Sequence, residues 1–433
     1  MRNLWFTISS IFSGMEVLFI SLFLMMLGAG LQGSLLGIRG DNEGFSTQML
    51  AMISSGYYVG FFAGSIIVPN LLKRVGYIRV FAALIAISSV AAVAYAMFVD
   101  QYLWFIMRVL TGFCFSGIYM IAESWLNLQT HNDNRAKVMG TYVIVLFIGM
   151  SAGQLFLNFG DINGYYLFAM ASVIISLASV PLLLAKRPAP LVAESTTTLS
   201  LLSLYKRSPF GAVASFAANF INGAVVGMAA IYAKTIGMPT EKIALFVASA
   251  FIGVVVFQFP IGYLSDRVDR RKAIIGLFFL SAVLATLAII ATDYTTVLIL
   301  LFALLGGVAL PLYGLCIAYV NDRLHPEEVL PATTALIKIS GIANMIAPVI
   351  VGYLMTRIGN EWFFGTTVVA AVSAMLFGIY RLYKGRDIII EEQGDFAHIG
   401  VAATPATLTL AHEGIQLEFD FGEAHQKSPQ NPS

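Results

Sequence analysis

The stretch Gly262-Tyr-Leu-Ser-Asp-Arg-Val-Asp-Arg-Arg271 separates two long apolar runs of this chain. With Lys272 it carries six charged side chains within seven positions, although only 11% of all residues are charged. Apolar runs of about 20 residues are long enough to cross the hydrocarbon core of a bilayer as helices. The stretch is therefore predicted to be a ten-residue loop at one membrane face, with its charges just outside the lipid.

Composition supports the membrane assignment and excludes several classes of protein. Hydrophobic residues make up 58% of the 433 residues, against roughly 45–50% in soluble domains. The net charge of +1 and the lack of a basic patch interleaved with aromatic residues argue against a nucleic-acid partner. Both cysteines, Cys114 and Cys316, fall inside apolar runs, so no disulfide framework is expected.

Hydropathy predicts an all-α polytopic membrane protein, because a helix satisfies its own backbone polar groups within lipid. Twelve transmembrane helices are expected, at about 15–38, 47–71, 79–99, 102–126, 138–158, 164–185, 209–234, 242–264, 273–292, 295–320, 331–356 and 362–381. They form an N-terminal bundle (1–185) and a C-terminal bundle (209–381), joined by a cytoplasmic linker (186–208) rich in Pro, Ser and Thr. The polar tail 382–433 is predicted to be disordered and cytoplasmic.

The distribution of Lys and Arg predicts the orientation of these helices. Of the 25 basic residues, 19 fall on the face that holds both termini, and the loops on the opposite face hold four. Those four are Arg39, Lys234, Lys242 and Arg357. Cytoplasmic loops of membrane proteins carry the excess of positive charge, so both termini are expected in the cytoplasm.

The two halves of the chain repeat each other at a spacing of 193 residues. At this offset Gly30 aligns with Gly223, Gly60 with Gly253, Arg74 with Arg267, Asp100 with Asp293 and Thr141 with Thr334. Each unit has an even number of spans, so the two repeats run parallel and are related by an axis along the membrane normal. Transporters built from parallel repeats bind their cargo between the halves.

Several motifs resemble the major facilitator superfamily. The opening stretch is similar to its G-x-x-x-D-R-x-G-R-R loop, with Asp269 in place of the last Gly, and Arg108-Val-Leu-Thr-Gly112 is similar to its R-x-x-x-G element. Segments 117–127 and 311–323 resemble the YcaD-like branch of bacterial transporters. The resemblance covers roughly residues 15–380. It implies a monomeric protein of the bacterial inner membrane that works by alternating access without a cofactor or metal.

In that superfamily the charged loop is expected to act as a cytoplasmic gate. The expected gate residues here are Asp266, Arg267, Arg270 and Arg271, with Asp322 placed to pair with Arg270 or Arg271. The equivalent loop of the first half has Lys73 where the second has Asp266. Glu123 is expected to supply the missing acid by pairing with Arg74 or Arg79. Proton carriage or static packing are alternatives for Glu123, and the basic residues of both loops also suit a plain topology signal.

Two cations, Arg108 and Lys338, lie within predicted spans and are the main candidates for a substrate cavity. Burying such a charge in lipid costs about 2.5–3.5 kcal/mol by insertion scales, so intramembrane cations usually face water or a ligand. From opposite halves they would suit an anionic or carboxylate-bearing solute, although snorkelling or pairing with carbonyls remain alternatives. Gln32, Tyr119, Asn222 and Asn344 are further cavity candidates, each of which also suits helix packing.

The predicted function is transport of a small organic solute by a secondary active transporter, coupled to protons or working by facilitated diffusion. All five histidines lie outside the spans, so a proton would have to be carried by Glu123 or Glu16. A lipid-handling flippase or a transceptor-like sensor are the alternatives. An enzyme is not expected, because the spans contain no paired carboxylates, His cluster or Ser/His arrangement, and no phosphate-binding Gly-rich loop is visible.

Overall fold

The architecture comes from a computed structural model of the chain, which describes residues 15–129, 135–184, 200–324 and 326–384. Most of the predicted linker (186–199) and most of the predicted tail (385–433) lie outside these residues. Twelve helices in the described part are long and apolar enough to span a membrane. The predicted all-α architecture with twelve spans is therefore confirmed.

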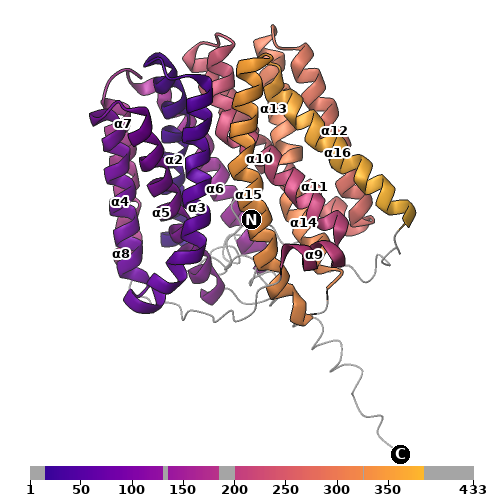
Figure 1. The fold of residues 1–433 in the computed structure, drawn as a ribbon. Coiled ribbons are helices and arrows are strands. Elements are labelled where there is room, and N and C mark those ends of the chain that lie inside the picture. Colours follow the sequence, from indigo (N-terminus) through magenta and orange to yellow (C-terminus); the bar gives the residue numbers. More distant parts are fainter. Residues whose placement is uncertain (1–14, 130–134, 185–199, 325, 385–433) are drawn as a thin grey trace, which may run out of the picture.

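The helices run side by side along one direction, as Figure 1 shows. Those of the first half are α2 (Glu16–Asn42), α3 (Thr47–Val75), α4 (Tyr77–Met97), α5 (Gln101–Gln129), α6 (Arg135–Leu155), the short η2 (Phe156–Phe159), α7 (Tyr166–Leu177) and α8 (Ser179–Leu184). Those of the second half are α9 (Leu201–Arg207), α10 (Pro209–Thr235), α11 (Thr240–Arg267), α12 (Arg270–Ile290), α13 (Thr295–Ala309), α14 (Leu312–Asn321), α15 (Pro326–Arg357) and α16 (Trp362–Lys384). The pair α7 and α8 makes the sixth span, and the pair α13 and α14 makes the tenth.

The predicted ten-residue loop at 262–271 is wrong in its extent. Helix α11 continues through Arg267 and α12 begins at Arg270, so only Val268 and Asp269 separate them. The Asp269 carboxylate accepts a hydrogen bond from the backbone N–H of Arg271 at 2.8 Å, which caps the start of α12. Hydropathy locates the point where the chain leaves the lipid, and the helix persists beyond that point because its backbone bonds do not depend on the lipid.

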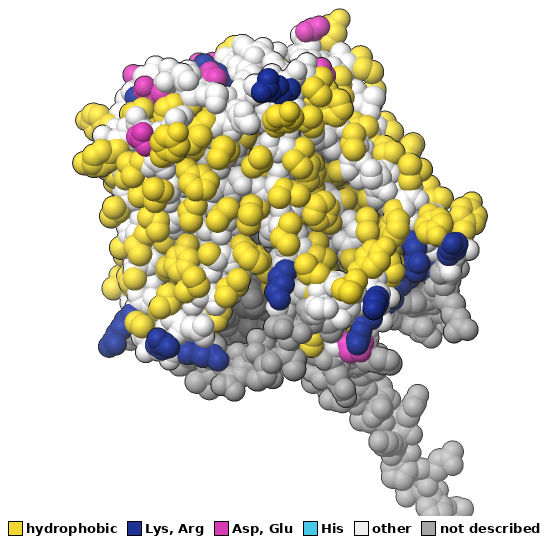
Figure 2. All heavy atoms as spheres, viewed as in Figure 1, with side chains coloured by type: hydrophobic (Ala, Val, Ile, Leu, Met, Phe, Trp, Pro, Cys, Tyr) yellow, Lys and Arg dark blue, Asp and Glu magenta, His cyan; other side chains and the backbone are white. Residues whose placement is uncertain are grey.

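Charged side chains gather at the two ends of the helices, and the two ends differ in sign (Figure 2). Basic residues follow the lower edge of the view, whereas most visible acidic residues lie at the upper edge. We name the lower end the basic face; it carries Lys73, Arg74, Arg207, Arg267, Lys272 and Arg323. The other end is named the opposite face.

The sequence repeat appears in the packing of both halves. A Cβ at Gly60 in α3 would lie 1.8 Å from the carbonyl oxygen of Val109 in α5, and a Cβ at Gly253 in α11 would lie 1.9 Å from that of Ala303 in α13. The contacts of Gly30 with Met150 and of Gly223 with Asn344 repeat in the same way. Glycine at these positions lets two helix backbones touch, as small residues do in membrane bundles. The two parallel six-helix repeats are thus visible at the level of single contacts.

We expect Gly60→Ala and Gly253→Ala to destabilise the protein by about 1–3 kcal/mol, because the added methyl overpacks a backbone contact. Thermal unfolding of the purified protein in detergent measures the effect. Gly276→Ala is the matched control, since a Cβ there meets nothing within 4 Å. An unchanged unfolding temperature in both variants would show that close backbone contact at these two glycines does not contribute to stability.

Candidate functional site

The two halves meet mainly through α3 against α15 and α6 against α11. In the first interface the Ser55 hydroxyl donates to the carbonyl oxygen of Met345 at 2.6 Å. In the second, the Ser151 hydroxyl donates to the carbonyl oxygen of Ala248 at 3.3 Å. Positions 55 and 248 are 193 residues apart and positions 151 and 345 are 194 apart, so the two bonds are equivalent under the repeat.

Both serine bonds lie toward the opposite face. Ser55 is eight residues from the start of α3, and Ala248 is eight residues from the start of α11, where both helices begin at that face. At 1.5 Å per residue this places each bond about 12 Å inside the helix ends. The identified polar contacts between the halves therefore close the molecule on the side away from the basic face.

A central cavity lies between the halves on the inner side of these contacts. Helices α3, α5 and α6 of the first half and α10, α11 and α15 of the second contribute to its wall. Its lining combines rings with a few hydroxyls and one amide: Tyr57, Tyr58, Phe61, Phe62, Tyr119, Phe147, Phe251, Ser65, Ser340 and Asn344. We call this space the ring compartment.

The cavity continues into a second space, the Arg108 compartment, which shares Tyr57, Tyr58, Tyr119, Met150, Val226 and Phe251 with the first. It is lined also by Arg108, Gln32, Thr111 and Gln154. Arg108 is half-buried, and its guanidinium carbon lies 4.9 Å from the centre of the Tyr57 ring. Within the part of the chain that the structure describes, no carboxylate pairs with it.

Four of the six predicted cavity residues line these compartments, and two do not. Arg108, Gln32, Tyr119 and Asn344 line them, whereas Lys338 and Asn222 are absent from both linings. Lys338 is half-buried on α15, next to the lining residue Ile337, and Asn222 is fully buried within α10. Among the described residues of these two linings Arg108 is the one cation, and Lys338 lies on α15 at the position after Ile337. The pairing of the two cations across one cavity stays a prediction.

Asn344 belongs to a polar cluster that the sequence did not identify as a unit. Its amide nitrogen donates to the Asn219 side-chain oxygen at 3.0 Å, and the Ser340 hydroxyl donates to the same oxygen at 2.7 Å. The cluster ties α10 to α15 beside the ring compartment. Ser340, Phe62 and Phe251 were missed as lining residues, because hydropathy treats a side chain facing an apolar cavity like one facing lipid.

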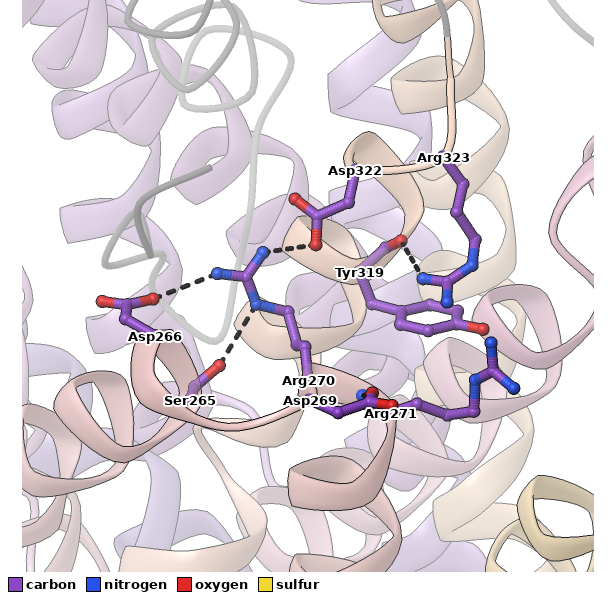
Figure 3. Close-up of polar contacts among 8 residues, drawn as sticks. All are labelled: Ser265, Asp266, Asp269, Arg270, Arg271, Tyr319, Asp322 and Arg323. Carbon is purple, nitrogen blue, oxygen red and sulfur yellow. Dashed lines mark hydrogen bonds and ion pairs between the residues drawn. The ribbon is translucent and has the colours of Figure 1, made fainter. Parts of the chain in front are cut away.

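At the basic face, Arg270 is the centre of an ionic cluster (Figure 3). Its side chain is only 1% exposed, and it donates to Asp322 at 2.5 Å, to Asp266 at 3.0 Å and to the Ser265 hydroxyl at 3.2 Å. The cluster joins the end of α11, the start of α12 and the residue after α14, all in the second half. Of the two predicted partners for Asp322, the structure shows Arg270.

The other basic residues of this stretch make different contacts. Arg271 is 2% exposed, donates to the carbonyl oxygen of Arg381 at 3.4 Å and lies beside Tyr319 (Figure 3). Arg267 is exposed and stacks on Tyr263, with 4.1 Å between the guanidinium carbon and the ring centre. The predicted gate residues thus divide into a buried set and an exposed one, which their sequence spacing does not reveal.

Glu123 is buried, with 1% exposure, and accepts a hydrogen bond from the Tyr142 hydroxyl at 2.9 Å. The contact links α5 to α6 within the first half. The expected pairing with Arg74 or Arg79 is not seen: both arginines are exposed and form no ion pair in the described part of the chain. Glu123 faces the interior of its bundle, whereas the two arginines lie at the α3–α4 turn.

Neutralising one acid of the Arg270 cluster should destabilise the second half. We expect Asp322→Asn to lower the free energy of unfolding by about 3 kcal/mol, because removing one partner of a buried pair leaves an under-compensated charge. Thermal unfolding of purified protein measures the loss. Arg74→Gln, which changes an exposed residue that forms no ion pair with any described residue, is the matched control. Equal stability of the two variants would contradict a structural role for the Asp322–Arg270 pair.

Comparisons with known proteins agree with this architecture. The sequence model of the Major Facilitator Superfamily matches residues 18–251 and again 211–410. An uncharacterized MFS-type transporter YcaD from Escherichia fergusonii is 22% identical over 354 residues, covering 81% of this chain and 91% of that protein. The protein of the same name from Salmonella arizonae is 23% identical, covering 83% of this chain and 92% of its own length.

Solved structures show the same fold. A substituted form of the nucleoside transporter NupG superposes with a TM-score of 0.69 at 15% identity, covering 83% of this chain and 98% of NupG. A second NupG structure gives 0.62 at 16% identity, with 86% and 99% covered. At this identity the likeness concerns the arrangement of the helices.

Proposed function

This chain belongs to the Major Facilitator Superfamily, and we propose that it is a secondary active transporter that moves a small organic anion by alternating access. As a member of that family it is a multi-pass membrane transporter rather than an enzyme. The observation that carries the proposal is a cavity lined by both halves that contains Arg108, a cation without a protein anion in the described part of the chain.

The contacts between the halves suit alternating access. At each of the two main interfaces the described residues form a serine-to-carbonyl bond, and both bonds lie toward the opposite face. Breaking them exposes few polar groups, so the halves can rock while each bundle stays intact through its glycine contacts. With the basic face in the cytoplasm, as the excess of Lys and Arg indicates, this conformation is the inward-facing one.

For the division into moving parts we keep the boundaries that the sequence predicts. We take residues 1–185 and 209–381 as the two rocking bundles, 186–208 as their cytoplasmic linker and 382–433 as a cytoplasmic tail. We take the protein to act as a monomer in a bacterial inner membrane, with one cavity between the two halves of each chain. Reporter fusions at both termini test the orientation.

Loss of the Arg108 charge should abolish uptake of the anion. We expect Arg108→Gln to reduce flux into proteoliposomes at least tenfold, because the cavity then offers no cation to a desolvated anion. Lys338→Gln, which lies outside both compartments, should lose less than threefold. Arg79→Gln, on an exposed residue, serves as the control for insertion and folding. Normal flux through the Arg108 variant would remove the cavity assignment.

Glu123 is the residue that we assign to proton coupling, because it is a buried carboxyl in a membrane helix close to the cavity residue Tyr119 on the same helix. We expect Glu123→Gln to abolish accumulation driven by a pH gradient while keeping solute exchange within about threefold of normal. Measuring flux with and without the pH gradient distinguishes gradient-driven accumulation from solute exchange. Tyr142→Phe, which keeps the carboxyl but removes its donor, should retain the dependence on the gradient. Gradient-driven accumulation by the Glu123 variant would place the proton site elsewhere.

A further inference from the structure

We propose that the transported solute is an aromatic monoanion, bound with its acid group at Arg108 and its ring in the ring compartment. The inference rests on the transport function proposed above and names the chemical class of the cargo. Three features of the described residues carry it: a cation with no anion among them, rings supplied by both halves, and buried amide atoms with no hydrogen-bond partner among them. The cation specifies the acid group of the solute, the rings specify its aromatic ring, and the amide atoms specify the polar groups at its two ends.

Arg108 selects the acid group. The Arg108 guanidinium carbon lies 4.9 Å from the centre of the Tyr57 ring, and no described carboxylate pairs with its N–H groups, which are available to a ligand. Those N–H groups form a fork that matches the two oxygens of a carboxylate. Among the described residues that line the two compartments there is no Asp or Glu, and Arg108 is the one basic residue. A single cation in a desolvated space compensates one negative charge, so a monoanion fits and a dianion would leave a charge uncompensated.

The walls select the ring. On α3 and α5, Phe61 lies 6.1 Å from both Tyr57 and Tyr119 between ring centres. On α6 and α11, Phe147 and Phe251 form a second pair at 6.0 Å. Both walls line the ring compartment, and they come from both halves. Aromatic rings attract one another in edge and offset contacts beyond the burial of apolar area, so a flat aromatic ring is preferred there over a saturated ring.

Unpartnered amide atoms select the polar ends. The Gln32 side-chain nitrogen is buried without an acceptor and lines the Arg108 compartment, where it can donate to the same acid group. The Asn344 side-chain oxygen is buried without a donor and lines the ring compartment. Buried polar groups in proteins nearly always have a partner. A hydrogen-bond donor on the ring, away from the acid group, would satisfy Asn344.

Isothermal titration of the purified full-length chain with four related compounds tests these three features one at a time. 4-Hydroxybenzoate has all three features; 4-hydroxybenzamide lacks the charge, 4-hydroxycyclohexanecarboxylate the flat ring, and benzoate the donor. We expect 4-hydroxybenzoate to bind, the amide to bind at least tenfold more weakly, and the other two at least threefold more weakly. Binding of the amide or of the saturated acid as tightly as 4-hydroxybenzoate would overturn the proposal.

Arg108→Gln should remove the preference for the acid over the amide. The matched control, Arg79→Gln, should keep that preference, because this residue is exposed and forms no ion pair in the described part of the chain. If both variants kept the preference, the acid group would bind elsewhere and the proposal would fail.

A labelling experiment separates failure of the solute class from failure of the transport function. Ser65→Cys places a thiol in the wall of the ring compartment, and the two native cysteines are buried. A membrane-impermeant maleimide is applied to each side of oriented vesicles, with and without 4-hydroxybenzoate. Protection by the acid supports the proposal. Labelling from both sides without protection overturns the solute class but leaves alternating access standing, whereas labelling from one side under all gradients contradicts alternating access itself.

Discussion

Inside a bilayer no water is available for backbone N–H and C=O groups, so each must find a partner within the protein. This constraint makes every span a helix and leaves side-chain size as the means of bringing helices together. In each half, a glycine backbone touches a carbonyl of a neighbouring helix: Gly60 against Val109, and Gly253 against Ala303. The halves themselves meet differently, through single serine hydroxyls on carbonyl oxygens at Ser55 and Ser151. Tight contact within the halves and sparse polar contact between them provide two rigid bodies with a separable interface.

The arginines illustrate how the same side chain acquires different roles. Arg270 is surrounded by two carboxylates and a hydroxyl, so its charge is compensated and its contribution is to hold α11, α12 and the end of α14 together. Arg108 lies beside the Tyr57 ring and has, among the described residues, no anion. A compensated charge stabilises a structure, whereas an uncompensated one in a cavity is available to a ligand. The site therefore lies in the cavity and not at the charged stretch.

Sequence reasoning was most accurate where the physical signal was linear along the chain. Hydropathy located twelve spans, and the 193-residue offset paired glycines that the structure shows in equivalent contacts. It failed where direction around a helix mattered. Lys338 and Ile337 are neighbours in the chain, but of the two only Ile337 is among the residues that line the ring compartment. For Glu123 the sequence favours a pairing with Arg74 or Arg79, whereas in the structure its carboxylate accepts a hydrogen bond from Tyr142. The length and mean hydropathy of a span do not change when the helix rotates about its axis. Hydropathy therefore does not predict which side chains face the cavity.

Four properties can be read from the sequence alone: the class of protein, the number of spans, the duplication and the face that carries the positive charge. Each depends on local composition, because transfer of a segment into lipid depends on the side chains of that segment. The rotation and packing of the helices decide which polar residues share a cavity, which arginine Asp322 contacts and on which side the halves are closed. Those outcomes depend on how helices rotate and pack against partners that are more than 100 residues away in several cases, such as Ser55 and Met345. Packing of this kind is a property of pairs of helices, and no single stretch of sequence contains it.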